Sequence, residues 1–127
     1  MSIRNNRSRS RIAVVAAALA GAAAMFAAPG TASADPSQWP CDSSEFCIYH
    51  DAQGGGSHLS LSEGVYDLGG VAGNLNDHVY SVKNISGGNW CLYRDAGYGN
   101  QAQLIPDGAA IDLDPGIASE ISSVQSC

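Results

Sequence analysis

Apolar and polar residues follow two different patterns along this chain. An alanine-rich apolar run covers residues 12–28. After residue 34 the apolar residues come in short groups that glycine and aspartate separate, and no stretch there has a helical period. The segment HLSLS at 58–62 alternates, which places Leu59 and Leu61 on one face of a strand. The pattern therefore predicts an apolar leader followed by an all-β domain.

Eight short strands are predicted after the leader, four in each half of the domain. In the segment VYSVKN, alternation predicts that Val79 and Val82 face opposite sides of the sheet. Thirteen residues of this domain are glycine, which favours tight turns over helices. The predicted strands cover residues 46–49, 58–62, 65–68, 79–84, 90–93, 101–105, 110–113 and 120–124.

The domain contains an internal repeat. The segment FCIYHDA at 46–52 matches WCLYRDA at 90–96, with an offset of 44 residues and identical Cys, Tyr, Asp and Ala. Two copies of a unit of about 40 residues are too few for a solenoid. The repeats, at about 46–82 and 90–124, instead predict two Greek-key motifs packed as a sandwich. Further matching pairs are EG at 63–64 with DG at 107–108, and SV at 81–82 with SV at 123–124.

Residues 1–34 are predicted to be a secretory signal peptide. Four arginines lie in the first eleven positions, the apolar run follows, and Ala32-Ser33-Ala34 offers small residues where a signal peptidase reads. The alternative is a membrane anchor, but 17 mostly alanine residues are short and weakly apolar for a span of roughly 20 residues. We therefore expect a secreted, extracellular protein with one domain at 35–127.

Removal of the leader leaves a strongly acidic domain. All twelve acidic residues lie from Asp35 onward, and only Lys83 and Arg94 are basic there, so the formal charge is 2 − 12 = −10. Nucleic-acid binders need basic groups to neutralise phosphates, and an anionic membrane surface repels an acidic domain. The charge therefore excludes both as partners.

The four cysteines form an even set in a small, exported domain, which indicates two disulfides. Four cysteines allow three pairings, and the sequence alone cannot choose among them. We favour Cys41 with Cys47 and Cys91 with Cys127, since the second bond ties the last residue to the body of the domain. A zinc site is the alternative, but Cys91 and Cys127 lack the close partners that zinc sites show.

Short motifs make the domain resemble a known family. They are two cysteines with five residues between them, a strand ending in tyrosine, a glycine-rich hairpin and a closing NDxxxSV segment, repeated in the second half. The pattern resembles the βγ-crystallin fold. More narrowly, it is similar to the bacterial proteinase-inhibitor family whose founding members block thermolysin-type metalloproteinases (peptidase inhibitor family 36). The resemblance runs from Pro40 to Cys127 and implies a secreted metalloproteinase inhibitor.

The crystallin signature has two aromatic residues five positions apart and a glycine two positions later. In the second half Tyr93 and Tyr98 match, and Asn100 stands in the glycine position. Asparagine tolerates the left-handed backbone that glycine adopts. In the first half Tyr49 matches, but Gly54 replaces the second aromatic residue. The resemblance implies that these residues build the fold rather than a binding site.

The resemblance also implies one candidate calcium site. Crystallin-type domains hold calcium with two acidic or amide residues, two spacers and two hydroxyl residues. The first half retains the leading pair in Asn76 and Asp77, and the second half retains the hydroxyl in Ser122. A composite site would use Asp77, Ser122 and a backbone oxygen of Asn76 or His78. Calcium takes six to eight oxygens, so two incomplete motifs make calcium a candidate ligand and not a required cofactor.

No catalytic residues are predicted. The three histidines, His50, His58 and His78, show no zinc-type spacing, and we interpret them as surface residues. The chain has no G-x-S-x-G nucleophile elbow. We therefore expect that the protein is not an enzyme.

An inhibitor of this family is expected to present a constrained loop as a poor substrate to an extracellular proteinase. In founding members the reactive bond lies in a small disulfide loop of the second half. Here the cysteine after Cys91 is Cys127, so that loop is missing. The loops predicted to be exposed and constrained are 71–74 and the segment of Asp42, Ser43, Ser44 and Glu45.

We expect a monomer, and two other functions stay open. One is a calcium-binding structural or stress module of the crystallin type. The other is a secreted antimicrobial or toxin of the same fold, although the charge of the domain argues against a membrane-lytic mechanism.

Overall fold

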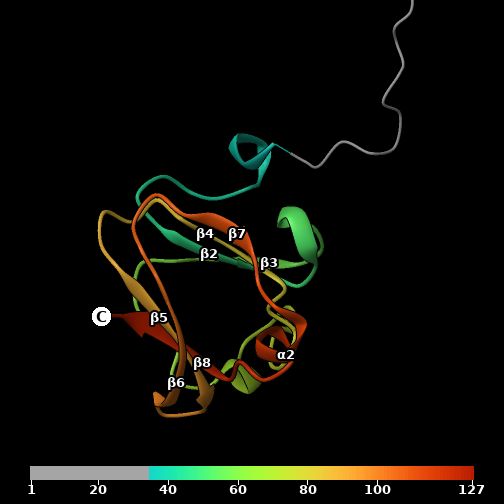
Figure 1. Cartoon of the computed structure of the whole chain (residues 1–127), viewed down its shortest axis with the longest axis vertical. Coiled ribbons are helices and arrows are strands. Elements are labelled where there is room, and N and C mark those ends of the chain that lie inside the picture. The colour runs from blue at the N-terminus through green and yellow to red at the C-terminus, as the bar shows by residue number, and fades with distance from the viewer. Residues whose placement is uncertain (1–34) are drawn as a thin grey trace, which may run out of the picture. The chain divides into compact units, whose positions relative to one another are not determined.

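A computed structural model describes residues 35–127 (Figure 1). The predicted signal peptide, with its apolar run and Ala32-Ser33-Ala34, lies outside the described residues. Within 35–127, no helix has the length and apolarity needed to cross a membrane.

The domain is all-β, as predicted, and consists of two antiparallel sheets. One sheet has the strand order β3-β2-β4-β7 and the other has the order β6-β5-β8. Figure 1 shows the first sheet above the second. The bounds are β2 Phe46–Tyr49, β3 His58–Leu61, β4 Ser81–Asn84, β5 Trp90–Asp95, β6 Gly99–Ile105, β7 Ala110–Asp112 and β8 Ser123–Ser126.

Each half of the sequence contributes backbone to the sheet of the other half. Strand β7 belongs to the second half but pairs with β4 of the first. In the reverse direction, Val65 bridges β8, and its N–H donates to the carbonyl of Val124 at 2.8 Å. The two halves are therefore joined by backbone hydrogen bonds as well as by packing, and neither sheet is complete without the other half.

The predicted strand at 65–68 is wrong beyond Val65. The Asp67 carboxylate accepts a hydrogen bond from the Gly69 N–H at 2.9 Å and begins the 3₁₀ turn η5, Leu68–Gly70. A short polar side chain that bonds the backbone two residues on favours a turn over a ladder. Other 3₁₀ turns are η3 Pro36–Gln38 and η4 Ala52–Gly54.

The last predicted strand begins later than expected, because a helical turn precedes it. Helix α2, Pro115–Ala118, is a single turn with Asp114 as its N-cap, which accepts from the Gly116 N–H at 2.8 Å. Proline at the first position favours this start. Four residues are too few to show a helical period, so the sequence pattern did not reveal the turn.

The core lies between the two sheets and contains residues from both halves. Phe46 and Trp90, which hold equivalent positions in the repeat, stack at 4.6 Å between ring centroids and an interplanar angle of 10°. Val79 and Val82 lie in the same core, so the predicted opposite orientation is wrong; β4 begins only at Ser81, and the alternation does not reach Val79. The buried apolar residues are Phe46, Ile48, Leu68, Leu75, Val79, Val82, Trp90, Leu92, Ile105, Leu113, Ala118, Ile121 and Val124.

Both favoured disulfides are present. Cys41 bonds Cys47, and Cys91 bonds Cys127 across 36 positions of sequence. The Cys127 N–H also donates to the carbonyl of Asn89 at 3.0 Å, so the last residue is held by two bonds. All four thiols are used in this way, and the alternative of a cysteine zinc site is wrong.

Candidate functional site

Two serines at equivalent positions fold the hairpins of the two halves over the sheets. Ser81 Oγ donates to the carbonyl of Asp51 at 2.6 Å and accepts from the Gly54 N–H at 2.9 Å. Ser123 Oγ makes the same two bonds, to the carbonyl of Asp95 and from the Tyr98 N–H, at 2.6 and 3.0 Å. The repeat seen in the sequence is thus a repeat of contacts, and these serines stabilise the fold.

The aromatic corner of the second half forms as expected. Tyr93 and Tyr98 meet edge to face at 5.8 Å. Asn100 adopts φ of 62°, so the asparagine does replace the glycine of the signature in a left-handed conformation.

In the first half, a residue from outside the repeat completes the corner. Gly54 is the counterpart of Tyr98, and a Cβ placed on it would lie 2.3 Å from Trp39 Cγ. Trp39 fills that space and meets Tyr49 edge to face at 5.6 Å. The Tyr49 hydroxyl donates to the carbonyl of Pro40 at 2.8 Å, and burial raises the pKa of Tyr49 to about 12. The sequence reading missed Trp39, and the glycine at the aromatic position was the only signal for it.

The segments of two predicted calcium ligands, Asp77 and Ser122, meet, since the Asp77 N–H donates to the carbonyl of Ile121 at 2.9 Å. Asp77 lines a hollow of about 360 Å³ with Arg94, Asp95, Asn100, Ser119 and Glu120, whereas Asn76 and Ser122 do not line it. Within this hollow Arg94 Nε donates to Glu120 Oε1 at 2.7 Å. A cation of the protein is therefore already paired with one of the three carboxylates that line this hollow, which opposes the binding of a metal cation there.

A second hollow, of about 330 Å³, lies beside the segment 42–45 and has no charged side chain in its lining. Serine and glycine residues contribute most of that lining, and Trp90, the aromatic residue in it, is only 3% exposed. Without a titratable group, the hollow offers no acid, base or charged ligand for chemistry.

The two predicted loops differ in chemistry. The segment 42–45 is polar, and the next apolar side chain, Phe46, is fully buried. The loop 69–74, which contains the predicted segment 71–74, exposes Val71 at 37%. On either side of this loop, Leu68 and Leu75 are anchored in the core.

Both loops are held by hydrogen bonds. In the first, the Asp42 N–H donates to Ser60 Oγ at 3.1 Å and the Glu45 carbonyl accepts from the Ile85 N–H at 3.1 Å, inside the Cys41–Cys47 ring. In the loop 69–74, the Gly73 carbonyl accepts from Ser57 Oγ at 2.5 Å. Both loops are therefore fixed, and the exposed apolar side chain distinguishes them.

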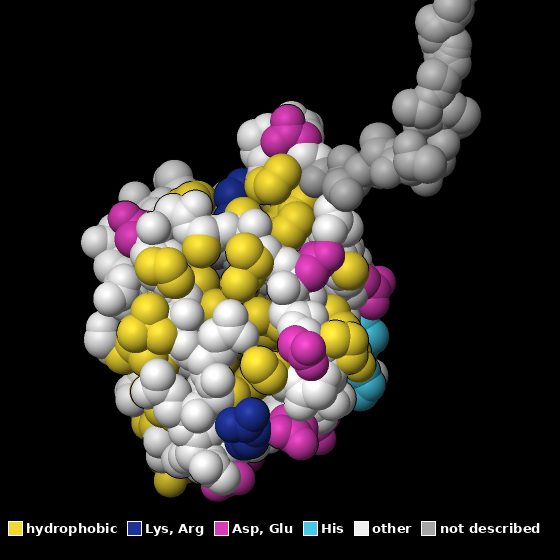
Figure 2. All heavy atoms as spheres, viewed as in Figure 1, with side chains coloured by type: hydrophobic (Ala, Val, Ile, Leu, Met, Phe, Trp, Pro, Cys, Tyr) yellow, Lys and Arg dark blue, Asp and Glu magenta, His cyan; other side chains and the backbone are white. Residues whose placement is uncertain are grey.

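Charged groups are spread over the surface. Figure 2 shows acidic side chains at several separate places on one face and histidine side chains at its edge. His58 and His78 are exposed, and the side chain of His50 is 30% exposed, so all three histidines reach the surface. The contact between His50 and His78 was missed, although the repeat aligns them with the ion pair of Arg94 and Glu120.

Comparisons with known proteins agree with this fold. The model of peptidase inhibitor family I36 matches residues 34–105, more than half of the chain. A βγ-crystallin from Ciona intestinalis is 26% identical with a TM-score of 0.55, and the match covers 65% of this chain and 99% of that one. A βγ-crystallin domain from Flavobacterium johnsoniae is 25% identical with a TM-score of 0.55, and the match covers 65% of this chain and 92% of that one. A βγ-crystallin from an archaeon is 24% identical with a TM-score of 0.56, and the match covers 68% of this chain and 100% of that one. A comparison with curated protein sequences finds no match.

Proposed function

Since the chain belongs to peptidase inhibitor family I36, we propose that it inhibits an extracellular metalloproteinase and that the loop 69–74 enters the cleft of that enzyme. The family supports a peptidase inhibitor with a proteinase as its partner, and not an enzyme. That the target is a metalloproteinase, and that the loop 69–74 is the segment that binds it, are parts of this proposal.

The target class comes from the founding members of the family, which block thermolysin-type enzymes. Such an enzyme prefers a bulky apolar residue directly after the scissile bond. The segment 42–45 offers no apolar side chain, because Phe46 is fully buried. The bond between Gly70 and Val71, in contrast, is followed by an exposed valine.

Exposure of Val71 between two buried leucines is the observation that carries the proposal. A loop already held in one shape loses little conformational entropy on docking. Leu68 and Leu75 lie in the core, 1% and 0% exposed, and the Gly73 carbonyl is bonded to Ser57. After cleavage at Gly70, both new ends would stay anchored near each other, so that product release is slow and the bond can be resealed.

Export is part of the same proposal. The two disulfides agree with an oxidising compartment, which is where an extracellular proteinase would be met. Cleavage after residue 34 and a monomeric state remain predictions. They are checked by N-terminal sequencing and by the mass of the secreted protein in solution.

The experiment titrates the purified protein against a thermolysin-like metalloproteinase and, separately, a serine proteinase, with a small peptide substrate as the readout. Val71→Asp should weaken inhibition of the metalloproteinase about 100-fold, since a carboxylate is costly to bury in an apolar pocket and 1.4 kcal/mol corresponds to a tenfold change. Val71→Leu should keep or improve it.

Ser43→Asp is the matched control, since it adds the same charge to the other constrained, exposed loop. It should leave inhibition unchanged. Mass spectrometry of the unfolded complex should find a cut between Gly70 and Val71. Equal inhibition by Val71→Asp and the parent protein would rule out this loop, and no inhibition of either enzyme class at micromolar concentration would rule out the function itself.

A further inference from the structure

His50 and His78 lie in contact at one end of the first sheet. Their rings stack at 4.9 Å between centroids with an interplanar angle of 4°. In the repeat they are the counterparts of Arg94 and Glu120, which form an ion pair at 2.7 Å. The fold therefore places two side chains together at this position in each half, and in the first half both are imidazoles.

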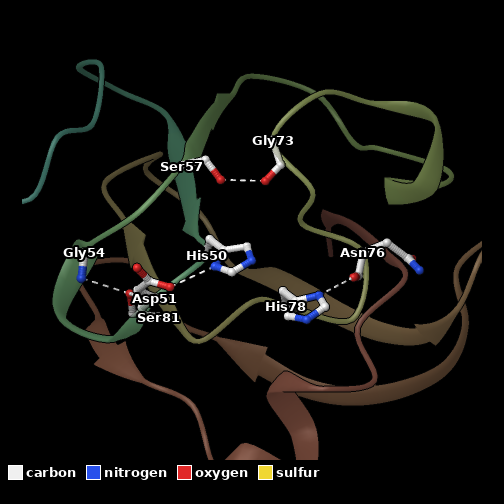
Figure 3. Close-up of polar contacts among 8 residues, drawn as sticks. All are labelled: His50, Asp51, Gly54, Ser57, Gly73, Asn76, His78 and Ser81. Atoms are coloured by element: carbon white, nitrogen blue, oxygen red, sulfur yellow. Dashed lines mark hydrogen bonds and ion pairs between the residues drawn. The ribbon is translucent and has the colours of Figure 1, made fainter.

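Each ring is oriented through its Nδ1 atom. His50 Nδ1 lies 2.8 Å from Asp51 Oδ1, and His78 Nδ1 lies 2.9 Å from the carbonyl oxygen of Asn76, as Figure 3 shows. Both partners can only accept, so each neutral imidazole must carry its proton on Nδ1. Each Nε2 atom then holds a lone pair.

This arrangement is the one that proteins use for histidines that bind metals. A ligating histidine almost always donates its other ring N–H to a carboxylate or a backbone carbonyl, which fixes the tautomer and the ring orientation. His50 has the carboxylate and His78 has the carbonyl.

The local charge also favours a cation. Asp51 is exposed beside the pair, and its carboxylate is the charged group in contact with His50. Both basic residues of the domain are engaged elsewhere. Lys83 Nζ donates to the carbonyls of Pro36 and Trp39 at 2.8 and 3.2 Å, and Arg94 donates to Glu120.

We propose that His50 and His78 together bind a divalent transition-metal ion such as Cu²⁺, Ni²⁺ or Zn²⁺ through their Nε2 atoms. Imidazole nitrogen suits these ions and not calcium. Among residues 35–127 no three His, Cys, Asp or Glu side chains are grouped to hold a metal, so two imidazoles are the protein ligands and water completes the set.

The parallel rings do not lie in one plane, so one of them has to turn before both lone pairs reach the same ion. His78 is exposed and His50 is half-buried, which makes His78 the ring that turns, about the hydrogen bond that its Nδ1–H keeps with the Asn76 carbonyl. This site uses neither the loop 69–74 nor the hollow of Asp77, and it is tested without any proteinase.

The first test is histidine-selective NMR of the protein expressed from its full sequence, with both disulfides formed and without a histidine tag. Before metal is added, His50 and His78 should show the Nδ1–H tautomer. Addition of Zn²⁺ chloride at neutral pH should shift the Nε2 signals of His50 and His78 together, at one ion per chain, and leave His58 unchanged. Equal shifts at all three histidines, or a shift at only one of the pair, would overturn the proposal.

The second test is calorimetry with Cu²⁺, Ni²⁺, Zn²⁺ and Ca²⁺ on matched variants. His50→Gln and His78→Gln should each weaken Cu²⁺ binding at least tenfold, because either change removes one arm of the chelate. His58→Gln removes a histidine outside the pair, whose ring lies against Tyr49 at 5.7 Å, and should bind like the parent protein. Cu²⁺ should bind most tightly, and Ca²⁺ should give no signal that depends on either histidine. Equal affinities in all three variants would also refute the site.

Discussion

Trp39 is expected to act as the missing aromatic residue of the first hairpin, and this can be tested by moving the aromatic group back to Gly54. Trp39 is 5% exposed and meets Tyr49 edge to face. Trp39→Ala should therefore cost about 3 kcal/mol, at the lower end for large-to-small core changes because Trp39 packs in a small cluster with Cys47 and Tyr49 and not in the main core. For a domain of this size that lowers the melting temperature by about 12–24 °C.

Gly54→Tyr on the parent protein should also destabilise, by about 2–3 kcal/mol, because its Cβ meets the Trp39 ring at 2.3 Å. The left-handed backbone of Gly54, with φ of 69°, also strains a tyrosine, but its counterpart Tyr98 adopts φ of 63°, and this strain is common to the single and the double variant. Combining Gly54→Tyr with Trp39→Ala removes the clash and rebuilds the pair seen in the second half. The free energy of unfolding of the double variant should thus be about 2 kcal/mol higher than the value obtained by adding the effects of the two single changes.

The assay is urea unfolding of the oxidised protein and its three variants, followed by circular dichroism. Gly88→Tyr serves as the control for adding a tyrosine, since a Cβ there meets nothing within 4 Å, and it should change stability by less than about 0.5 kcal/mol. Additive effects of Trp39→Ala and Gly54→Tyr, within about 0.5 kcal/mol, would refute the idea that the two residues share one space.

Two further predictions concern pH and calcium. Burial raises the pKa of Tyr49 from about 10 in the unfolded chain to about 12, so the stability that the neutral phenol contributes should be complete below pH 10 and lost as the pH rises to 12. Tyr49→Phe should flatten the plot of unfolding free energy against pH between these values. A plot that Tyr49→Phe leaves unchanged would contradict the assignment. Arg94→Gln should let Ca²⁺ raise the melting temperature, because it removes the cation paired with Glu120 in the hollow that Asp77 and Asp95 also line, whereas the parent should not respond. A rise in the parent of equal size would show that Arg94 does not oppose calcium.

Most of the strands could be predicted because their signals are local. FCIY, HLSL and AID carry alternating or buried apolar groups between glycine and aspartate turns, and β2, β3 and β7 lie where they were expected. The strand predicted at 65–68 failed since Asp67 bonds the backbone at Gly69, a competition that apolar periodicity does not register.

Less of the candidate site could be predicted from the sequence. The loop 71–74 could be named, but its anchors could not, because Leu68 and Leu75 become anchors only when both sheets close over them. The calcium prediction joined the leading pair of the first half to a hydroxyl of the second half on residue types alone. The position of Arg94 beside Glu120 depends on how β5 meets the turn after α2, which residue types do not specify.

The sequence by itself determined the all-β class, the two-fold repeat, the expected number of cross-links and the acidity of the domain, since each depends on residue types or on neighbours a few positions apart. Only the tertiary structure decided that the halves exchange backbone between sheets, that Trp39 fills the space at Gly54, and that His50 stacks on His78. These contacts join residues far apart in the chain. Their approach is set by the packing of two sheets around one core, and no local pattern encodes that geometry.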